Sequence, residues 1–329
     1  MVATGALMAK QRLIDTPIKI GISYCLLGQK IRFDGGHKHD RYITDILGGF
    51  FRFVPVCPEI EVGMGVPREA VRLEGLPDSP RMVGNKTGAD WTERMNRYSR
   101  ERVRRRDFAD LCGYILKKDS PSCGMKQVKL YISENNVQHI ATGLFARVLM
   151  ERFPHLPVEE EGRLTDLRLR ENFIVRVFAY HRLQQLWRER FSRRRVIEFH
   201  TTHKYLLLAH SPTHYKQLGQ LVAAIDRPPA DEFRVRYSAL FMEALKVKTT
   251  VNKNVNVLMH ILGFLKRQLT ADERKDILAV IDDYHKELVP LVVPLTLVRH
   301  YVAKHQVAYI QDQMYLNPHP KELMLRNHV

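Results

Sequence analysis

The chain has 329 residues, of which 45% are hydrophobic and 27% charged, which excludes a disordered protein and favours two globular domains over one core. Its 52 Lys and Arg residues outnumber 36 Asp and Glu, and the excess is +5 in residues 1–162 and +11 in residues 163–329. A net charge of +16 favours a polyanionic partner over a small neutral one, the alternative being solvated basic surfaces.

The N-terminal segment, residues 1–19, contains Lys10, Arg12 and Asp15 but no long apolar stretch, so we expect no signal peptide. No later apolar run approaches the length of a membrane span. We therefore expect a cytoplasmic protein without membrane contact.

The first half of the chain alternates β-prone and helical segments. Strands are predicted over residues 17–23 and 51–56, a helix over 91–111, and a third strand over 113–117. Strands separated by helical stretches are typical of a parallel, Rossmann-like α/β sheet.

Three of the four cysteines follow these strands. Cys25, Cys57 and Cys123 each lie just beyond a carboxyl end, where open parallel sheets bind ligands, whereas Cys112 precedes a strand and is expected to be a small buried residue. In a reducing compartment such cysteines indicate metal ligation, catalysis or burial. Zinc sites usually contain closely spaced cysteine pairs, which are absent here. Three isolated thiolates suit an iron–sulfur cluster with one iron lacking a protein ligand.

A domain boundary is predicted near residue 165. Residues 153–163 contain two prolines and three consecutive glutamates, which we interpret as a connector. From Asp166 onward apolar residues recur at helical spacing. We therefore predict an α/β domain over residues 1–165 and an all-α domain over residues 166–329.

Three blocks carry a family resemblance. They are residues 22–28 with 33–36, residues 54–59 with 65–68, and residues 118–124. In this order they resemble the thiouracil desulfidase (TudS-like) family over residues 17–163. The second half, through residues 199–205, 210–215 and 315–323, resembles the YbgA-like helical domain often fused to it. This architecture is similar to that of bacterial tRNA 4-thiouridine desulfidases.

The resemblance implies a 4Fe–4S cluster held by Cys25, Cys57 and Cys123, with one iron open. It also implies a catalytic glutamate, which maps onto Glu59, and a catalytic serine, which maps onto Ser120 with Ser122 as the alternative. A soft thiocarbonyl sulfur binds iron well, and an open iron can polarise the C–S bond as a Lewis acid. Water activated by Glu59 would then replace sulfur without electron transfer, while the serine donates a hydrogen bond or relays a proton.

Two further residues of the same blocks are candidate substrate contacts. Asp34 begins an Asp-Gly-Gly run, which is also an ordinary turn signal. Arg68 can hold a uracil carbonyl or a phosphate through its planar guanidinium, or pair with Glu61 or Glu69. Both alternatives remain open for each residue.

In the helical domain we expect basic and aromatic side chains to contact tRNA. The candidates are His203, Lys204, His214 and Tyr215, which follow an arginine cluster at residues 188–195, and Lys253 of a later polar group. The alternatives are arginines stabilising a helix end, aromatic residues packed in the core, and a metal pair of His200 with His203.

The favoured function is desulfuration of 4-thiouridine in tRNA to uridine, with release of hydrosulfide by a monomer. The alternatives are a desulfidase of free thiouracil, a tRNA-thiolating sulfurtransferase, and an RNA-binding protein with a structural cluster. No glycine-rich phosphate loop is present, so we expect no nucleotide cofactor, which argues against thiolation.

Overall fold

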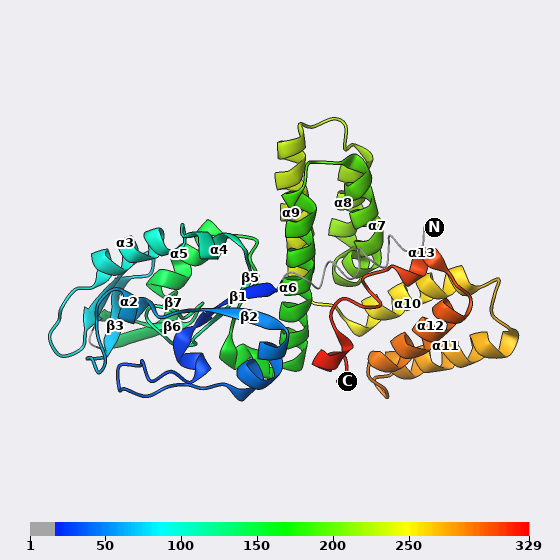
Figure 1. Ribbon diagram of the computed structural model, residues 1–329. Coiled ribbons are helices and arrows are strands. Elements are labelled where there is room, and N and C mark those ends of the chain that lie inside the picture. The colour runs from blue at the N-terminus through cyan, green and yellow to red at the C-terminus, as the bar shows by residue number, and fades with distance from the viewer. Residues whose placement is uncertain (1–16, 134, 329) are drawn as a thin grey trace. The chain divides into compact units, whose positions relative to one another are not determined.

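The computed structural model describes residues 17–133 and 135–328. Most of the segment for which we predict no signal peptide lies outside these residues. The chain divides into two compact units, Met1–Asp166 and Leu167–Val329 (Figure 1). Each unit is described by itself below.

The first unit contains a four-stranded parallel sheet. Its strands, in the spatial order β2-β1-β5-β8, are β1 (Ile18–Ser23), β2 (Phe51–Val56), β5 (Leu111–Leu116) and β8 (Val158–Glu160). All six residues of β5 are buried, as expected for a strand covered on both faces. Gly21 of β1 is required by packing, because a Cβ there would lie 2.2 Å from the ring of Tyr114. The prediction of a parallel, Rossmann-like sheet is confirmed.

Strand β8 corrects the interpretation of residues 153–163 as a connector. Glu159 and Glu160 are only 4% and 3% exposed, yet both carboxylates have internal partners. Arg163 Nε donates to Glu159 Oε1 at 2.6 Å, and the backbone N–H of Met125 donates to Glu160 Oε1 at 2.9 Å. Glu159 and Glu160 therefore belong to a buried edge strand of the sheet, which ends before Glu161.

A second, mixed sheet was not predicted from the sequence. Its strands, in the order β4-β3-β6-β7, are β3 (Val71–Leu76), β4 (Ser79–Gly84), β6 (Val128–Ser133) and β7 (Asn136–Ala141). Strands β3 and β6 are parallel, and the other two pairs are antiparallel. One face of this sheet packs through Leu73 and Leu130 against Met95 of α3 (Thr92–Arg102) and Leu144 of α5 (Leu144–Arg152).

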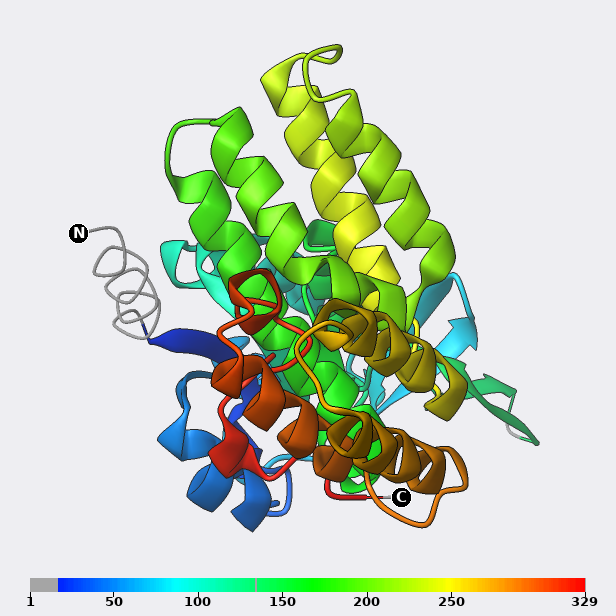
Figure 2. The same cartoon turned by 90° about the vertical axis from the view of Figure 1, so that its right-hand side faces the viewer.

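The second unit is all-helical, as predicted. Its helices are α6 (Leu167–Arg188), α7 (Arg193–His210), α8 (Pro212–Ala223), α9 (Ala230–Lys246), α10 (Val251–Leu265), α11 (Ala271–His285), α12 (Val292–Lys304) and α13 (Ala308–Gln311). Helices α6 to α9 run side by side, and α10 to α12 pack on one another (Figures 1 and 2). Their apolar faces form one core that includes Phe233, Tyr237 and Ile261. Within the described residues, none of the helices combines the length and apolar character that crossing a bilayer would need.

Candidate active site

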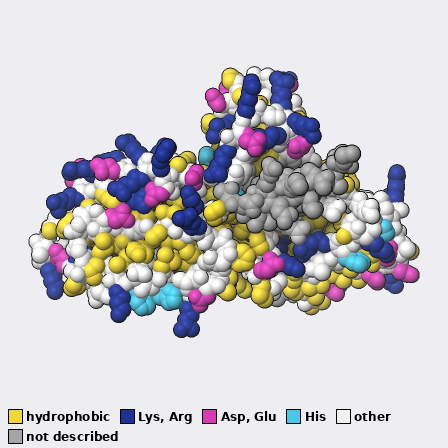
Figure 3. Space-filling model, in the orientation of Figure 1, with side chains coloured by type: hydrophobic (Ala, Val, Ile, Leu, Met, Phe, Trp, Pro, Cys, Tyr) yellow, Lys and Arg dark blue, Asp and Glu magenta, His cyan; other side chains and the backbone are white. Residues whose placement is uncertain are grey.

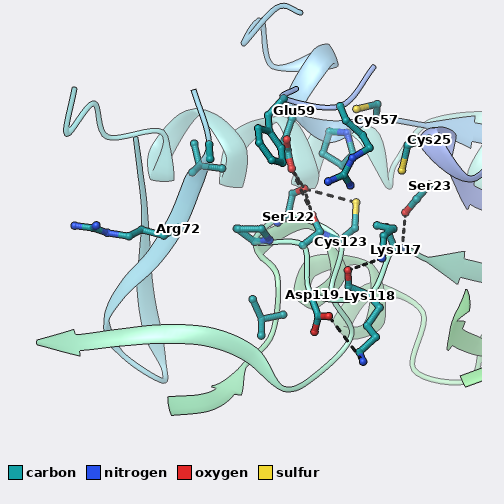
Figure 4. Close-up of a pocket in the computed structure, with 18 of the residues that line it drawn as sticks. Ser23, Cys25, Cys57, Glu59, Arg72, Lys117, Lys118, Asp119, Ser122 and Cys123 are labelled. Atoms are coloured by element: carbon teal, nitrogen blue, oxygen red, sulfur yellow. Dashed lines mark hydrogen bonds and ion pairs between the residues drawn. The ribbon is translucent and has the colours of Figure 1, made fainter. Parts of the chain in front are cut away.

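Cys25, Cys57 and Cys123 lie at the same edge of the parallel sheet. Cys25 follows β1 in a 3-10 turn (Tyr24–Leu27), Cys57 is the N-cap of α2 (Pro58–Glu61), and Cys123 lies in the loop after β5. Strands β2, β1 and β5 are neighbours and run in one direction, so their carboxyl ends meet. All three cysteines line one cavity of about 840 Å³ (Figure 4).

The loop that carries Cys123 is held by the start of α5. The backbone N–H of Leu144 donates to the carbonyl of Pro121, and those of Phe145 and Ala146 donate to the carbonyl of Ser122, at 3.0–3.1 Å. The first N–H groups of a helix have no partner within the helix, so they are free to bind a neighbouring loop. The helix therefore fixes the position of Cys123.

The three thiols are free, with Cys123 buried and the other two partly buried. Burial raises the pKa of each thiol, to about 11 for Cys57, while the ammonium of Lys117 opposes the effect at Cys25. Charge on Cys57 would interact with charge on both of the other cysteines, so the three sulfurs share one electrostatic environment. A positively charged group in the cavity would stabilise all three as thiolates.

This donor set fits an iron–sulfur cluster. No three His, Cys, Asp or Glu side chains within the described residues converge as the ligands of a single metal ion do. The cysteines of a cluster bind different irons, so they need to surround one space rather than one point. Three free thiols lining one cavity meet that condition, and their ligation of a cluster remains a prediction.

Glu59 lies in the same cavity and is held on both carboxylate oxygens. Its Oε2 accepts hydrogen bonds from Nε of Arg68 at 3.1 Å and from a terminal nitrogen of the same guanidinium. Its Oε1 accepts from the hydroxyl of Ser122 at 2.7 Å (Figure 4). The same oxygen accepts from the hydroxyl of Ser120 at 3.4 Å. The side chain of Glu59 is 14% exposed, so this carboxylate is largely shielded from water.

The two candidate serines play different parts in this network. Ser122 is 1% exposed, and its hydroxyl also contacts the sulfur of Cys123 at 3.6 Å. Ser120 is only partly buried, its Oγ accepts the backbone N–H groups of Ser122 and Cys123, and it lies 3.0 Å from Oγ of Ser122. Ser122 is therefore positioned to orient Glu59, and Ser120 is the hydroxyl that is more open to the cavity.

Arg68 pairs with Glu59, not with Glu61 or Glu69 as considered from the sequence. Its Nη1 donates to the carbonyls of Ile31 at 3.0 Å and Gly65 at 2.9 Å. These contacts occupy its guanidinium, and its side chain is only 6% exposed, so it acts as a brace for Glu59.

Asp34 and Cys112 do not line the cavity, although Asp34 pairs at 3.5 Å with Arg32, which does. Asp34 is exposed, and its carboxylate accepts the backbone N–H of Gly36 at 3.0 Å, which is the turn alternative of the sequence analysis. That hydrogen bond lowers the pKa of Asp34. Cys112 is 1% exposed, as expected, but it lies inside β5 rather than before it.

The cavity is lined by more cations than the sequence analysis identified. Its charged lining residues are Arg32, Lys38, Glu59, Arg68, Arg72, Lys117, Lys118, Asp119 and Lys129. Several of these stand on or beside the unpredicted second sheet. The alternation of charged and apolar residues in Val71–Leu76 and Val128–Ser133 was the signal that could have revealed its strands.

In the helical unit, the structure places His203 in the core. His203 is 1% exposed, stacks on Phe199 with ring centroids 4.1 Å apart, and bonds the carbonyl of Phe199 through Nδ1 at 2.7 Å. Burial lowers its pKa to about 3. A neutral, buried imidazole is not available to a polyanion, so His203 is corrected from an RNA contact to a core residue.

The other four candidates of the helical unit also make internal contacts. Lys253 Nζ donates to the carbonyl of His210 at 2.8 Å, and His214 bonds Ser211 at the start of α8. Lys204 lies 5.0 Å from the centroids of the Tyr205 and Tyr309 rings, and Tyr215 packs against the core. Their sites favour structural roles, although each is only partly buried.

The arginine cluster of residues 188–195 is partly neutralised by ion pairs. Arg194 pairs with Glu198 at 2.7 Å, Arg195 with Glu189 at 2.5 Å, and Arg193 with Asp226. Figure 3 shows Lys and Arg side chains spread over the visible face, with carboxylates among them. The number of arginines in residues 188–195 therefore overstates the net positive charge that this cluster presents to solvent.

Comparison with known proteins agrees with the motifs. Residues 20–161 match the family model of 2-thiouracil desulfurase, and residues 204–320 match a protein family of unknown function, DUF1722. "Uncharacterized protein YbgA" of Escherichia coli (strain K12) is 30% identical over 161 residues, which are 49% of this chain and 95% of that protein. A solved structure of the [4Fe-4S]-dependent thiouracil desulfidase TudS is 28% identical, covers 46% of this chain and 96% of that chain, and gives a TM-score of 0.39.

The chain thus combines a 2-thiouracil desulfurase domain with a DUF1722 region. It belongs to the family of YbgA. The resemblance recognised from the sequence blocks is confirmed.

Proposed function

We propose that this protein hydrolytically removes sulfur from a thiolated uracil base, with 4-thiouridine of tRNA as the substrate and hydrosulfide as the product. One observation carries the proposal: Cys25, Cys57 and Cys123 line the same cavity as Glu59 and its two serine partners. A soft-metal donor set and a shielded carboxylate in one cavity are the two parts that such a reaction needs.

The three cysteines would hold a 4Fe–4S cluster. When bound, it supplies a Lewis-acidic iron for the thiocarbonyl sulfur. The protein contributes the remaining steps through Glu59 and the serines.

Glu59 is the group that removes a proton from the attacking water. Arg68 fixes Oε2 and places a positive charge beside the carboxylate, which leaves Oε1 as the proton-accepting oxygen. Ser122 orients Oε1, and Ser120, which is the more open hydroxyl, donates to the ring or relays a proton through Ser122.

The charge of the cavity supports a nucleotide rather than a neutral base. Seven Lys and Arg side chains line it, and five of them pair with carboxylates, which leaves Lys38 and Lys129 without such a partner among the described residues. A phosphate-bearing substrate complements these two charges, and they support tRNA as a partner together with the basic balance of the whole chain.

Free thiouracil is the second candidate substrate, and the match to the 2-thiouracil desulfurase family favours it. The two candidates are separated by reconstituting the protein anaerobically with iron and sulfide, then comparing kcat/KM for free 4-thiouracil with kcat/KM for 4-thiouridine tRNA. We expect the tRNA value to be at least about tenfold higher because phosphate contacts add binding energy. Equal kcat/KM values for the two substrates, or a higher value for the free base, would contradict tRNA as the substrate and favour free thiouracil.

A further inference from the structure

One face of the second sheet packs against α3 and α5, and the opposite face carries polar and aromatic side chains among the described residues. Along β3 and β6, Leu73 and Leu130 point to the helices, so the alternate residues Arg72, Lys129 and Tyr131 point to the opposite face. His139 of β7 is paired with Lys129 and therefore shares that face. These four residues, which we call the open-face cluster, all line the cavity of the cysteines.

Two cations of the open-face cluster differ in their partners. Lys129 is exposed, and no carboxylate among the described residues pairs with it. Arg72 pairs with Glu74 at 2.5 Å and lies over the ring of Tyr131, 5.2 Å from its centroid. Lys129 therefore offers a free charge, and Tyr131 offers a ring whose orientation Arg72 supports.

The open-face cluster extends the cavity beyond the catalytic residues. Figure 4 shows Arg72 on a strand away from Cys25 and Cys57, with Glu59 and Ser122 between them. A uracil base at the cysteines would leave this part of the cavity to whatever is attached to the base. In a nucleic acid, that is the sugar–phosphate backbone and the next nucleotide.

Aromatic and basic side chains on an open four-stranded sheet are a known way to bind single-stranded RNA, because the ring stacks on a base while cations contact phosphates. We propose that the open-face cluster binds the single-stranded RNA that flanks the thiolated base. Lys129 contacts a phosphate and Tyr131 stacks on the neighbouring base. The placement of the reacting base at the cysteines rests on the proposed function, whereas the inference that the open-face cluster binds RNA does not.

The test uses the full chain and a uridine oligonucleotide with one central 4-thiouridine. The variants are Lys129→Glu and Tyr131→Leu, and the control is Lys126→Glu, an exposed lysine of the preceding loop that does not line the cavity. We expect each of the two variants to raise KM for the oligonucleotide about tenfold. We expect kcat/KM for free 4-thiouracil to stay unchanged, and the control to behave as wild type.

A binding measurement separates this inference from the proposed function. Affinity of the cluster-free protein for unmodified oligo-uridine is measured by fluorescence anisotropy at several salt concentrations. In both Lys129→Gln and Lys129→Glu, the slope of log affinity against log salt should be less steep than in the wild type by about 0.7. This is the contribution of one phosphate contact on a single strand.

The possible outcomes differ clearly. If the wild type binds the oligonucleotide but does not desulfurate it, the proposed function is contradicted. If that binding is weakened in the open-face variants and not in the control, the RNA surface is supported all the same. Unchanged binding in Lys129→Glu and Tyr131→Leu, or an equal loss in Lys126→Glu, would overturn the RNA surface whatever the catalytic result.

Discussion

At the scale of single residues, the site is organised around the carboxylate of Glu59. Arg68 holds one of its oxygens, and the hydroxyls of Ser122 and Ser120 approach the other. A carboxylate with both oxygens fixed loses little orientational freedom when a proton is transferred to it. This preorganisation is what positions a general base in a reaction.

Replacement of Glu59 tests this role. Glu59→Gln keeps the shape of the side chain but removes the base, so we expect kcat to fall by about 10² to 10⁴ while the bound iron stays at the wild-type level. Steady-state desulfuration and iron content are measured on the same reconstituted sample. Asp34→Asn is the matched control, because Asp34 lies outside the cavity, and it should retain full activity. Wild-type activity in Glu59→Gln would remove Glu59 from the mechanism.

The two serines are distinguished by a pair of variants. Ser120→Ala removes the hydroxyl that is more open to the cavity and that also accepts the backbone N–H groups of Ser122 and Cys123, so we expect a lower kcat together with a loss of about 1–3 kcal/mol in unfolding free energy. Ser122→Ala deprives Glu59 of its shorter hydroxyl contact inside a buried site, so we expect a loss of similar size with a smaller fall in kcat. Kinetics and urea unfolding of both variants check this, and a larger fall in kcat for Ser122→Ala than for Ser120→Ala would contradict the division of roles.

Residue types were predicted better than side-chain directions. The sequence blocks indicated Glu59, Ser120 and Ser122, and all three meet in one cavity. His203 and Lys253 were candidate RNA contacts because of their chemistry, but His203 faces the core and Lys253 binds the carbonyl of His210. The orientation of a side chain on a helix depends on what packs around it, which local sequence does not record.

At the scale of elements, the site depends on α5 holding the loop of Cys123. Gly143 is the N-cap of α5, and a Cβ there would lie 2.5 Å from the carbonyl oxygen of Ser122 and 2.9 Å from the nitrogen of Cys123. Both atoms belong to the backbone, so the loop itself would have to move.

Gly143→Ala is therefore expected to destabilise the first unit by about 1–3 kcal/mol and to reduce the iron bound on reconstitution. Gly49→Ala serves as the control, since a Cβ at Gly49 meets nothing within 4 Å. Thermal unfolding and iron content are the measurements. Normal iron content in Gly143→Ala would show that the loop does not need this contact.

Strands made of a continuous β-prone run were predicted from the sequence, and strands in which charged and apolar residues are mixed were not. Strands β1, β2 and β5 are marked by β-prone runs that end near a cysteine. Strand β8 was mistaken for a connector because its burial depends on contacts distant in sequence, such as the hydrogen bond from Met125 to Glu160 and the pairing of β8 with β5. The second sheet was missed because its strands expose one face and carry charges on it.

At the scale of the whole molecule, the two units should respond differently to acid. The helical unit buries His203 and His210, and burial lowers their pKa values to about 3 and about 4. These values lie below the ordinary value of about 6.5, so a falling pH protonates the unfolded chain first. The stability that neutral burial provides is complete above about pH 6.5 and is lost as the pH falls toward 4.

At pH 5 the loss should be about 2 kcal/mol for each of these histidines. Hydrogen exchange of α7 peptides at pH 7 and pH 5, followed by mass spectrometry, locates the effect in the helical unit. Protection of α7 that does not change between the two pH values would contradict it.

The central claim is that Cys25, Cys57 and Cys123 make this chain a desulfidase. The most direct measurement is the release of hydrosulfide from 4-thiouridine tRNA, with loss of the near-ultraviolet thiouridine absorbance, by protein reconstituted anaerobically with iron and sulfide. We expect release by the wild type and by Cys112→Ser, and none by serine variants of the other three cysteines. Release by any of those three variants at the wild-type rate, or no release from any thiolated base by the wild type, would contradict the claim.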